Sequence, residues 1–344
     1  MARRHTGQSV ADVYLPGVIV HGVQLGLGLL LLYFGAEWLV KGAAGLARSF
    51  GVPALIVGLT VVGYGTSAPE MTVSMIAAFR GSSAIALGNV VGSNIANIGL
   101  ILGVTALIAP PSTDGKLIRR EIPLMLLTCV LLPITLWDGV ITRLEGIALL
   151  GIAVAFTGWL VSDARRSRAP GASTASEHAG VIEQAAEEAG APPGERRGLL
   201  ALYALAGLVL LVLGGEMFVR GAVGIAHHFG IEDRIVGLTV VAIGTSLPEL
   251  ATSIVAAKRG HSDLAVGNVV GSNLYNVLLV LGATSAVRPV EGQLATMHFD
   301  LAVLTAMTLF AAMAMRTRRT LARWEGAVLL LSYLAFLVVL VVRR

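Results

Sequence analysis

GLTVVGYGTSAPEMTVSMIAAFRGSSAIALGNVVGSNIANIGLILG (residues 58–103) and GLTVVAIGTSLPELATSIVAAKRGHSDLAVGNVVGSNLYNVLLVLG (residues 237–282) align without a gap. The offset is 179 residues, and 28 of the 46 aligned positions are identical. Upstream, FGAEWLVKGAAGLARSFG (34–51) matches LGGEMFVRGAVGIAHHFG (213–230) at the same offset. Self-similarity of this length indicates one structural unit that occurs twice. We therefore expect two similar halves.

The chain around these segments is strongly apolar. Of its 344 residues, 55% are hydrophobic and only 13% are charged, whereas a soluble domain has about 25% charged residues. About 20 apolar residues suffice to cross the hydrocarbon core, and such runs recur throughout. We predict an all-α polytopic membrane protein of ten transmembrane helices. The predicted spans are residues 20–46, 54–79, 84–109, 121–137, 144–163, 199–228, 235–257, 263–287, 298–315 and 321–342.

Each half contributes five of these spans: 1–163 is the first repeat, 164–197 a linker and 198–344 the second repeat. Because five is odd, the second half must enter the membrane from the opposite side. The prediction is an inverted repeat with broken helices at its centre, a plan in which transporters bind substrate between the halves. Duplication kept only for packing is the alternative. It is disfavoured because the best-matched segments are also the most polar parts of the spans.

Lys and Arg residues predict the orientation. With both termini outside, fifteen of them fall in inner loops and eight in outer segments, as the positive-inside rule requires. The linker, rich in Ala, Gly, Pro and Glu, is expected to be disordered and cytoplasmic. The same rule accounts for the net charge of +4, so no nucleic-acid partner is expected. Cys129 is the only cysteine, which excludes an internal disulfide and a thiolate metal site.

Two carboxylates stand out, because Glu70 and Glu249 occupy matching positions within apolar spans. A charge at that depth costs at least about 2.5–3.5 kcal/mol on insertion scales. Two such costs at symmetric positions suggest a compensating ligand. Elsewhere, Glu37 with Lys41 and Glu216 with Arg220 repeat at i,i+4 and predict structural ion pairs.

Each of these two glutamates ends a GTSxPE motif, GTSAPE (65–70) or GTSLPE (244–249). The proline lacks an N–H and clashes with the preceding turn, so each span should break there. Carbonyls around 63–66 and 242–245 should then be freed, which is tolerable at that depth only beside a cavity or a ligand. A capping box, with Ser67 or Ser246 as N-cap, is the alternative. It would describe how the broken helix begins without excluding a binding site.

The partner spans carry GNVVGSNIAN (88–97) and GNVVGSNLYN (267–276). Their paired glycines have the small-xxx-small spacing that allows helices to approach closely. Each serine lies one turn before an asparagine on the same helix face. Packing explains the glycines, and interhelical hydrogen bonds explain one asparagine. The glycine pair and the serine–asparagine pair occur together in both halves, each time beside a buried glutamate. This combination favours a binding site. The residues concerned are Gly88, Gly92, Ser93 and Asn97, and Gly267, Gly271, Ser272 and Asn276.

These oxygen-bearing groups suit a hard cation. Calcium takes 6–8 oxygens in flexible geometry, which the two glutamates and the carbonyls of Thr66 and Thr245 begin to supply. The absence of His and Cys from the motifs argues against zinc, copper and iron. Magnesium would require a stricter octahedron. Sodium could use freed carbonyls with neighbouring hydroxyls, those of Ser67, Ser93, Ser246 and Ser272.

The paired motifs GTSAPE…GNVVGSNIAN and GTSLPE…GNVVGSNLYN resemble the two alpha-repeats of the calcium/cation antiporter superfamily, in its prokaryotic sodium/calcium exchanger branch. The resemblance implies that Glu70 and Glu249 are shared calcium carboxylates, helped by Thr66 and Thr245. The serines named above, with the carbonyls of Gly63 and Ala242, would line sodium positions, and Asn97 matches the family's amide. It also implies a prokaryotic cytoplasmic membrane and alternating access, with the first helix of each half sliding across the other eight.

One position departs from the sodium exchangers that have a third acidic group, since Asn276 stands where they carry Asp. The main hypothesis is a calcium:sodium antiporter that expels calcium. Calcium:proton exchange, with the two glutamates taking protons, is the alternative, and a cation channel is a third reading. No nucleophile–base or His-rich set suggests an enzyme. Calcium, sodium or protons, and membrane lipid, are the expected partners, with no cofactor and no obligate protein partner.

Overall fold

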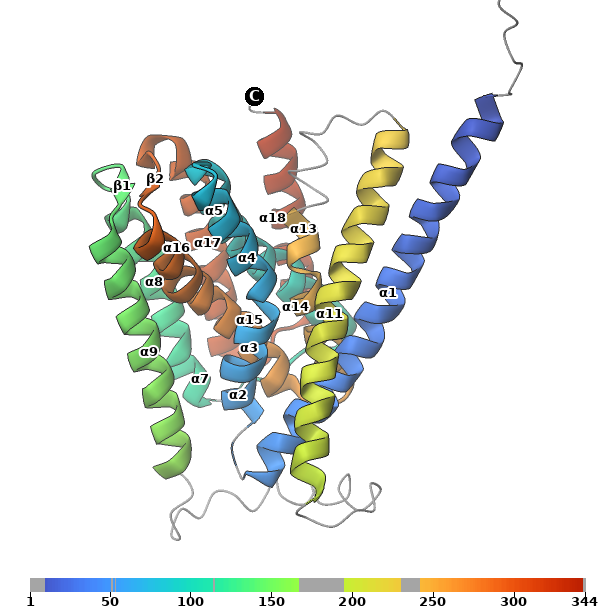
Figure 1. Cartoon of the computed structure of the whole chain (residues 1–344). Coiled ribbons are helices and arrows are strands. Elements are labelled where there is room, and N and C mark those ends of the chain that lie inside the picture. Colours follow the sequence, from blue (N-terminus) through green and yellow to red (C-terminus); the bar gives the residue numbers. More distant parts are fainter. Residues whose placement is uncertain are drawn as a thin grey trace, which may run out of the picture.

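The computed structural model describes residues 10–50, 52, 54–113, 115–166, 195–229 and 242–342. The regular secondary structure of the described chain is helical apart from two short strands and one isolated bridge (Figure 1). Most of the predicted linker, and the beginning of the predicted span 235–257, lie outside the described residues.

The first half consists of helices that follow the predicted spans closely, with π-helical segments marked η. They are α1 (Val10–Ser49), α2 (Ala54–Val57), η1 (Gly58–Val62), α3 (Gly63–Thr66), α4 (Ala68–Phe79), α5 (Ser83–Ala96), η2 (Asn97–Ile101), α6 (Leu102–Ile108), α7 (Gly115–Arg119), α8 (Glu121–Thr135) and α9 (Arg143–Arg166).

The second half repeats this order in the part that is described. Its helices are α11 (Glu195–His228), α13 (Ala242–Thr245), α14 (Leu247–Lys258), α15 (Ser262–Tyr275), η4 (Asn276–Leu281), α16 (Gly282–Val287), α17 (Leu294–Arg318) and α18 (Arg323–Val342). The strands β1 (Val140–Ile141) and β2 (Val290–Glu291) pair antiparallel, with Val140 opposite Glu291.

Among the described residues, seven helical stretches are long and apolar enough to cross a membrane. The stretches 83–108 and 262–287 form the centre of the molecule, since 72% and 94% of their apolar windows are buried. The first stretch, 18–47, is only 17% buried. The short helices on either side of the breaks and the 15-residue α8 fall below this length, so a total of ten spans stays a prediction.

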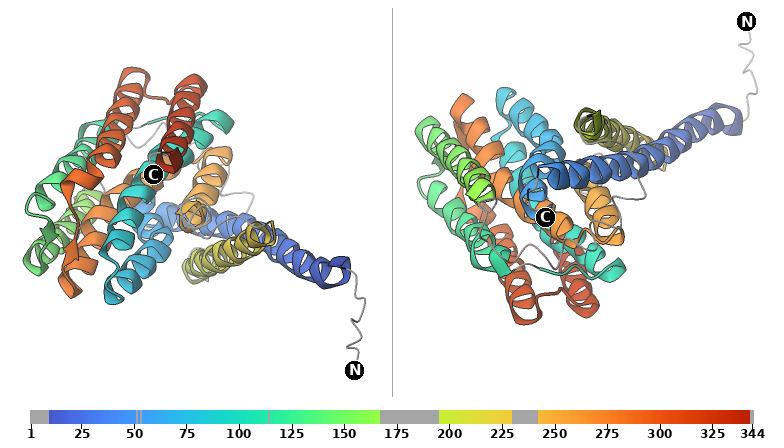
Figure 2. Two further views of the ribbon diagram at one scale, coloured as in Figure 1. Left: turned by 90° about the horizontal axis from the view of Figure 1, so that it is seen from above. Right: turned by 90° about the horizontal axis from the view of Figure 1, so that it is seen from below.

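Helices α1 and α11 lie side by side and antiparallel at one flank of the bundle (Figures 1 and 2). A Cβ atom built on Gly35 would lie 2.8 Å from the backbone nitrogen of Leu211, and one on Gly207 would lie 2.4 Å from that of Leu39. Such contacts exclude any side chain. The glycines of this seam recur every seven residues on both helices and match at the repeat offset, as Gly28, Gly35 and Gly42 on α1 and Gly207, Gly214 and Gly221 on α11.

Connecting segments gather at the two ends of the bundle. At the end where β1 pairs with β2, Arg288 donates to the carbonyl of Phe79 at 2.9 Å. At the opposite end, Arg197 donates to the carbonyl of Ser49 at 2.9 Å and Arg323 to that of Leu107 at 3.1 Å. The beginning of α1 and the end of α18 share the β-strand end (Figure 1). These groups of loops are the ones that the predicted topology assigns to common sides.

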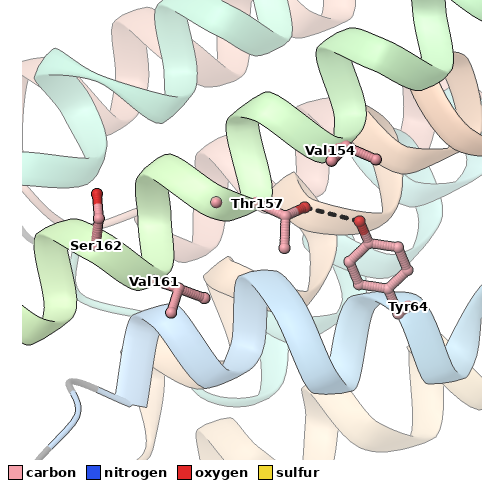
Figure 3. Close-up of a pocket in the computed structure, with 6 residues that line it drawn as sticks. Tyr64, Val154, Thr157, Val161 and Ser162 are labelled. Atoms are coloured by element: carbon pink, nitrogen blue, oxygen red, sulfur yellow. Dashed lines mark hydrogen bonds between the residues drawn. The ribbon is translucent and has the colours of Figure 1, made fainter.

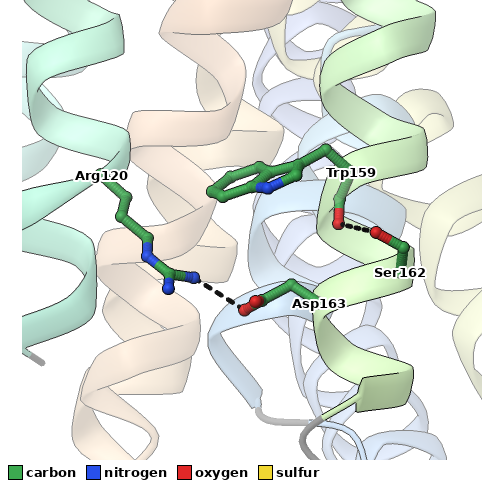
Figure 4. Close-up of polar contacts among 4 residues, drawn as sticks. All are labelled: Arg120, Trp159, Ser162 and Asp163. Atoms are coloured by element: carbon green, nitrogen blue, oxygen red, sulfur yellow. Dashed lines mark hydrogen bonds and ion pairs between the residues drawn. The ribbon is translucent and has the colours of Figure 1, made fainter.

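Arg120, which precedes α8, is anchored to the end of α9 (Figure 4). Its Nη1 lies 2.8 Å from Asp163 Oδ2, and its guanidinium lies 5.4 Å from the ring centroid of Trp159. Ser162 donates to the carbonyl of Trp159 at 2.8 Å. Arginine with tryptophan at a helix end is typical of a membrane interface.

One predicted ion pair is wrong. Glu37 pairs with Arg259 at 2.6 Å in place of Lys41, because the guanidinium reaches both carboxylate oxygens, a geometry that an ammonium cannot match. Lys41 lies 4.5 Å from the centroid of the Tyr203 ring. The pair between Glu216 and Arg220 is confirmed.

Candidate cation-binding site

Each half has a helix that stops and restarts at a serine. Helix α3 ends at Thr66, and α4 begins after Ser67 with proline in its first turn. The same break separates α13 from α14 at Ser246. Proline suits the first turn of a helix because its missing N–H would have no partner there. The GTSxPE motifs therefore start a new helix within the bundle, as predicted.

The two breaks are joined by a pair of crossed hydrogen bonds. Ser67 Oγ donates to Glu249 Oε1 at 3.4 Å, and Ser246 Oγ donates to Glu70 Oε1 at 3.2 Å. Both serines occupy the N-cap positions named in the capping-box alternative, but neither side chain makes a capping hydrogen bond to its own helix. Each hydroxyl instead donates to the carboxyl group of the opposite half.

Both carboxylates are almost fully enclosed. The exposed fraction is 1% for Glu70 and 0% for Glu249. Within the described residues the Oε2 atom of each has no hydrogen-bond partner. Buried polar atoms without partners cost about 1–3 kcal/mol each, and more when charged. Four other atoms of the predicted site are also buried without a hydrogen-bond partner in the described residues: Asn97 Oδ1 and Nδ2, Asn276 Oδ1 and Ser272 Oγ.

Two asparagines that the sequence interpretation did not single out hold the glutamate backbones. Asn89 Nδ2 donates to the carbonyl of Glu70 at 3.0 Å and to Ser74 Oγ at 2.9 Å. The second half has the same arrangement at the repeat offset, in which Asn268 Nδ2 donates to the carbonyl of Glu249 at 3.3 Å and to Ser253 Oγ at 3.0 Å. All six residues are identical between the repeats, and that polar identity within apolar spans was the available signal.

Asn268 also connects the halves. Thr66 Oγ1 lies 3.1 Å from Asn268 Oδ1 and 3.1 Å from the carbonyl of Val62. Thr66 is fully buried, whereas its counterpart Thr245 is half-buried.

The two amides begin π-helical segments, Asn97 in η2 and Asn276 in η4. Helix α14 packs against η2, and α4 packs against η4. Each glutamate-bearing helix therefore meets the asparagine segment of the other half. Short π-helical insertions are frequent at functional sites. The buried serines of these helices, Ser93 and Ser272, lie one turn before the amides.

The prediction of freed carbonyls needs a correction at Gly63. Its carbonyl accepts the amide N–H of Ser67 at 3.2 Å, because Ser67 still has an N–H and only Pro69 lacks one. In the second half the amide of Ser246 bonds the carbonyl of Ile243 at 3.1 Å, and Ala242 is the first residue of α13. A carbonyl oxygen has two lone pairs, so the bond at Gly63 leaves one for another ligand.

Close helix packing is confirmed for one of the predicted glycine pairs. Added Cβ atoms on Gly267 and Gly271 would lie 2.9 and 2.8 Å from the carbonyl oxygens of Leu55 and Leu59. The repeat offset places the corresponding neighbours of Gly88 and Gly92 at residues 234 and 238, outside the described residues.

A groove of about 450 Å³ lies elsewhere, between α9 and α3 (Figure 3). Thr157 Oγ1 lies 2.7 Å from the Tyr64 hydroxyl and 3.2 Å from that of Tyr275. The residues that line it include none of the predicted ligands; they are Tyr64, Val154, Thr157, Gly158, Val161 and Ser162. The glutamates, asparagines and serines among the predicted ligands are instead buried within the bundle.

These features agree with what is found in known proteins. A family model described as sodium/calcium exchanger protein matches residues 20–162 and 199–342, one range in each half. The chain belongs to the sodium/calcium exchanger family. It is therefore a multi-pass membrane transporter, a calcium/cation antiporter of the prokaryotic type.

Three similar proteins match over nearly the full chain. The inner membrane protein YrbG of Escherichia coli is 37% identical, over 91% of this chain and 94% of its own. The sodium/calcium exchanger MaX1 of Methanosarcina acetivorans is 32% identical, over 94% of this chain and 99% of its own. A structure of the sodium-calcium exchanger NCX_Mj aligns with a TM-score of 0.79 and 31% identity. The alignment covers 95% of this chain and 100% of that chain.

Proposed function

We propose that this antiporter exchanges calcium for sodium and normally expels calcium, driven by inward sodium. The observation that carries the proposal is the pair of buried carboxylates, each with one oxygen bonded to a serine of the opposite half and one oxygen without a partner. Two carboxylates neutralise one divalent cation. Carboxylate, amide, hydroxyl and carbonyl oxygens are the ligands that calcium takes in flexible number.

The proposed site has two overlapping ligand sets. Calcium is bound by Glu70 and Glu249 with the carbonyls of Thr66 and Thr245, and Asn97 and Asn276 contribute amide oxygens. Sodium uses the same carboxylates with nearby hydroxyls and carbonyls, which come from Ser67, Ser93, Ser246, Ser272, Gly63 and Ala242. Because the sets share the carboxylates, the two ions compete, and competition of this kind is what coupled exchange requires.

We also propose the topology in which this site operates. The ten predicted spans form two inverted five-helix repeats, residues 1–163 and 198–344, joined by a cytoplasmic linker, with both termini outside a prokaryotic cytoplasmic membrane. Support comes from loops that gather by predicted side and from the antiparallel α1–α11 pair. Alternating access then moves this pair across the rest of the bundle.

Asn276 favours calcium:proton exchange as a second candidate. With an amide at this position, the described site has two carboxylates where exchangers with a third acidic group would have three. Fewer fixed charges leave fewer anionic ligands for several sodium ions, whereas two enclosed glutamates can each accept a proton. The two candidates differ in which gradient moves calcium.

Purified protein in liposomes separates them by calcium-45 uptake. We expect uptake when vesicles are loaded with sodium and diluted into sodium-free buffer at equal pH, and little uptake with potassium inside. Uptake that ignores the sodium gradient and collapses with the pH gradient would establish the proton alternative. Calcium flux that needs neither gradient would indicate a channel.

A further inference from the structure

Asn94 is a buried amide (2% exposed) that belongs to neither ligand set proposed above. It lies on α5 and contacts the second half twice. Its Nδ2 donates to the backbone carbonyl of Asn273 at 3.3 Å, and its Oδ1 accepts from Asn276 Nδ2 at 3.0 Å. The chain of hydrogen bonds therefore runs from a backbone carbonyl, through Asn94, to an amide of the candidate site.

The direction of this chain is determined by its first member. A backbone carbonyl can only accept, so the NH₂ group of Asn94 must face Asn273. The oxygen of Asn94 then faces Asn276, so Asn276 must donate to it through its own NH₂ group. A flipped Asn276 would set two acceptor oxygens against each other. Its Oδ1 is therefore turned away from Asn94, and this buried oxygen has no hydrogen-bond partner among the described residues.

The first half has no equivalent of this arrangement in the described residues. Asn97, the counterpart of Asn276, has no partner for either its oxygen or its nitrogen. Asn273, the counterpart of Asn94, donates its Nδ2 to the carbonyl of Val269 in its own helix at 2.8 Å. The two amides of the site are thus unequal: hydrogen bonds set the orientation of Asn276, and none sets that of Asn97 among the described residues.

We propose that Asn94 is a positioning residue that fixes the amide of Asn276 with its oxygen toward the bound cation. This inference rests on the proposed cation site. A pre-set oxygen needs no rotation when the ion arrives, which favours binding, and partners behind a ligand commonly change metal affinity 10–100-fold when removed. Asn97 supplies the adaptable amide.

The test compares Asn94→Leu, which keeps the branched arrangement of heavy atoms and removes both hydrogen bonds, with Asn273→Leu, its counterpart at the repeat offset. Calcium is titrated into detergent-purified protein, and calcium-45 uptake is measured in liposomes. We expect Asn94→Leu to weaken calcium affinity about tenfold or more and Asn273→Leu to stay within about threefold. Gel filtration and the thermal midpoint check folding, and Asn94→Ala replaces a leucine variant that does not fold.

A double-mutant cycle with Asn276→Asp separates orientation from general packing. A carboxylate presents an oxygen whichever way it turns, so in this background Asn94→Leu should cost no affinity. An equal loss in both backgrounds would show that Asn94 acts only on packing and would overturn the inference. So would unchanged affinity in the single variant. A wild-type protein that does not bind calcium would instead refute the proposed function itself.

Discussion

At the scale of single residues, the two buried carboxylates at the centre of the bundle are each only half satisfied by hydrogen bonds. Glu70 and Glu249 each use one carboxylate oxygen for a serine of the opposite half and leave the other without a partner. A structure under selection for stability alone would satisfy such buried groups, because each unpaired atom costs free energy. The uncompensated oxygens therefore indicate where a cation is expected to bind.

Removing either charge should abolish exchange. Glu70→Gln and Glu249→Gln are expected to weaken calcium binding about 100-fold or more, roughly 2.8 kcal/mol, because one carboxylate cannot neutralise a divalent ion. Calcium-45 uptake in liposomes measures the effect. Glu216→Gln is the matched control, since its carboxylate is 53% exposed and pairs on the surface with Arg220. Normal uptake by a Glu70 or Glu249 variant would exclude that residue from the site.

The crossed serines give a second residue-scale prediction. Ser67→Ala and Ser246→Ala should weaken calcium affinity by similar factors, about three- to tenfold, because each removes a hydrogen bond worth roughly 1 kcal/mol from an equivalent contact. Ser285→Ala is the control: this serine is also buried, but it bonds the carbonyl of Leu281 in its own helix. A large loss in one serine variant and none in the other would contradict equal roles for the two hydroxyls.

At the scale of elements, much of the site could be predicted because it is repeated in the sequence. Roles that depend on contacts between helices could not be predicted. The glutamates, the GTSxPE breaks and the asparagines at 97 and 276 could be read from one alignment of the chain with itself. Asn89, Asn94 and Asn268 stood in the same alignment, but their roles depend on which backbone carbonyl lies opposite, and the sequence does not show that. The ion pair assigned to Glu37 failed for the same reason, since its partner Arg259 is 222 residues away.

The glycine seam between α1 and α11 was also present in the sequence as a period of seven, and it predicts an effect on stability. Gly35→Leu places a side chain against the backbone of Leu211, so the helices must separate. The protein should lose about 1–3 kcal/mol or more, with a lower thermal midpoint in detergent and slower calcium-45 exchange.

Gly26→Leu is the control on the same helix, because a Cβ atom at Gly26 meets nothing within 4 Å in the described structure. Its thermal midpoint should stay close to that of the wild type. Equal loss in both variants would show that helix α1 tolerates leucine poorly everywhere and that the seam has no special role.

At the scale of the whole molecule, the two ends of the bundle differ in charge. Among the described residues, the end near Arg120, Arg197 and Arg323 holds more basic residues than the end near the paired strands. By the positive-inside rule, we expect the first of these ends to face the cytoplasm.

Labelling tests this orientation. The natural cysteine, Cys129, is buried and is first replaced by serine. A new cysteine at Ser176, in the linker, should react with a membrane-impermeant maleimide in inside-out vesicles, and one at Ser82, between α4 and α5, should react in right-side-out cells. The reverse pattern would show that the orientation in the membrane is opposite to the predicted one. Labelling of both positions from one side would contradict the inverted-repeat arrangement.

The crossed serine–glutamate contact also bears on how such a chain can be assembled. Ser67 touches Glu249 and Ser246 touches Glu70, so one contact is made twice, as across the two-fold axis of a dimer of identical subunits. Neither half completes it alone. Residues 1–163 and 198–344, produced as separate polypeptides, should therefore recover exchange when co-expressed and show none when either is made by itself. A gene that encoded a single such half would have needed to insert its product into the membrane in both directions.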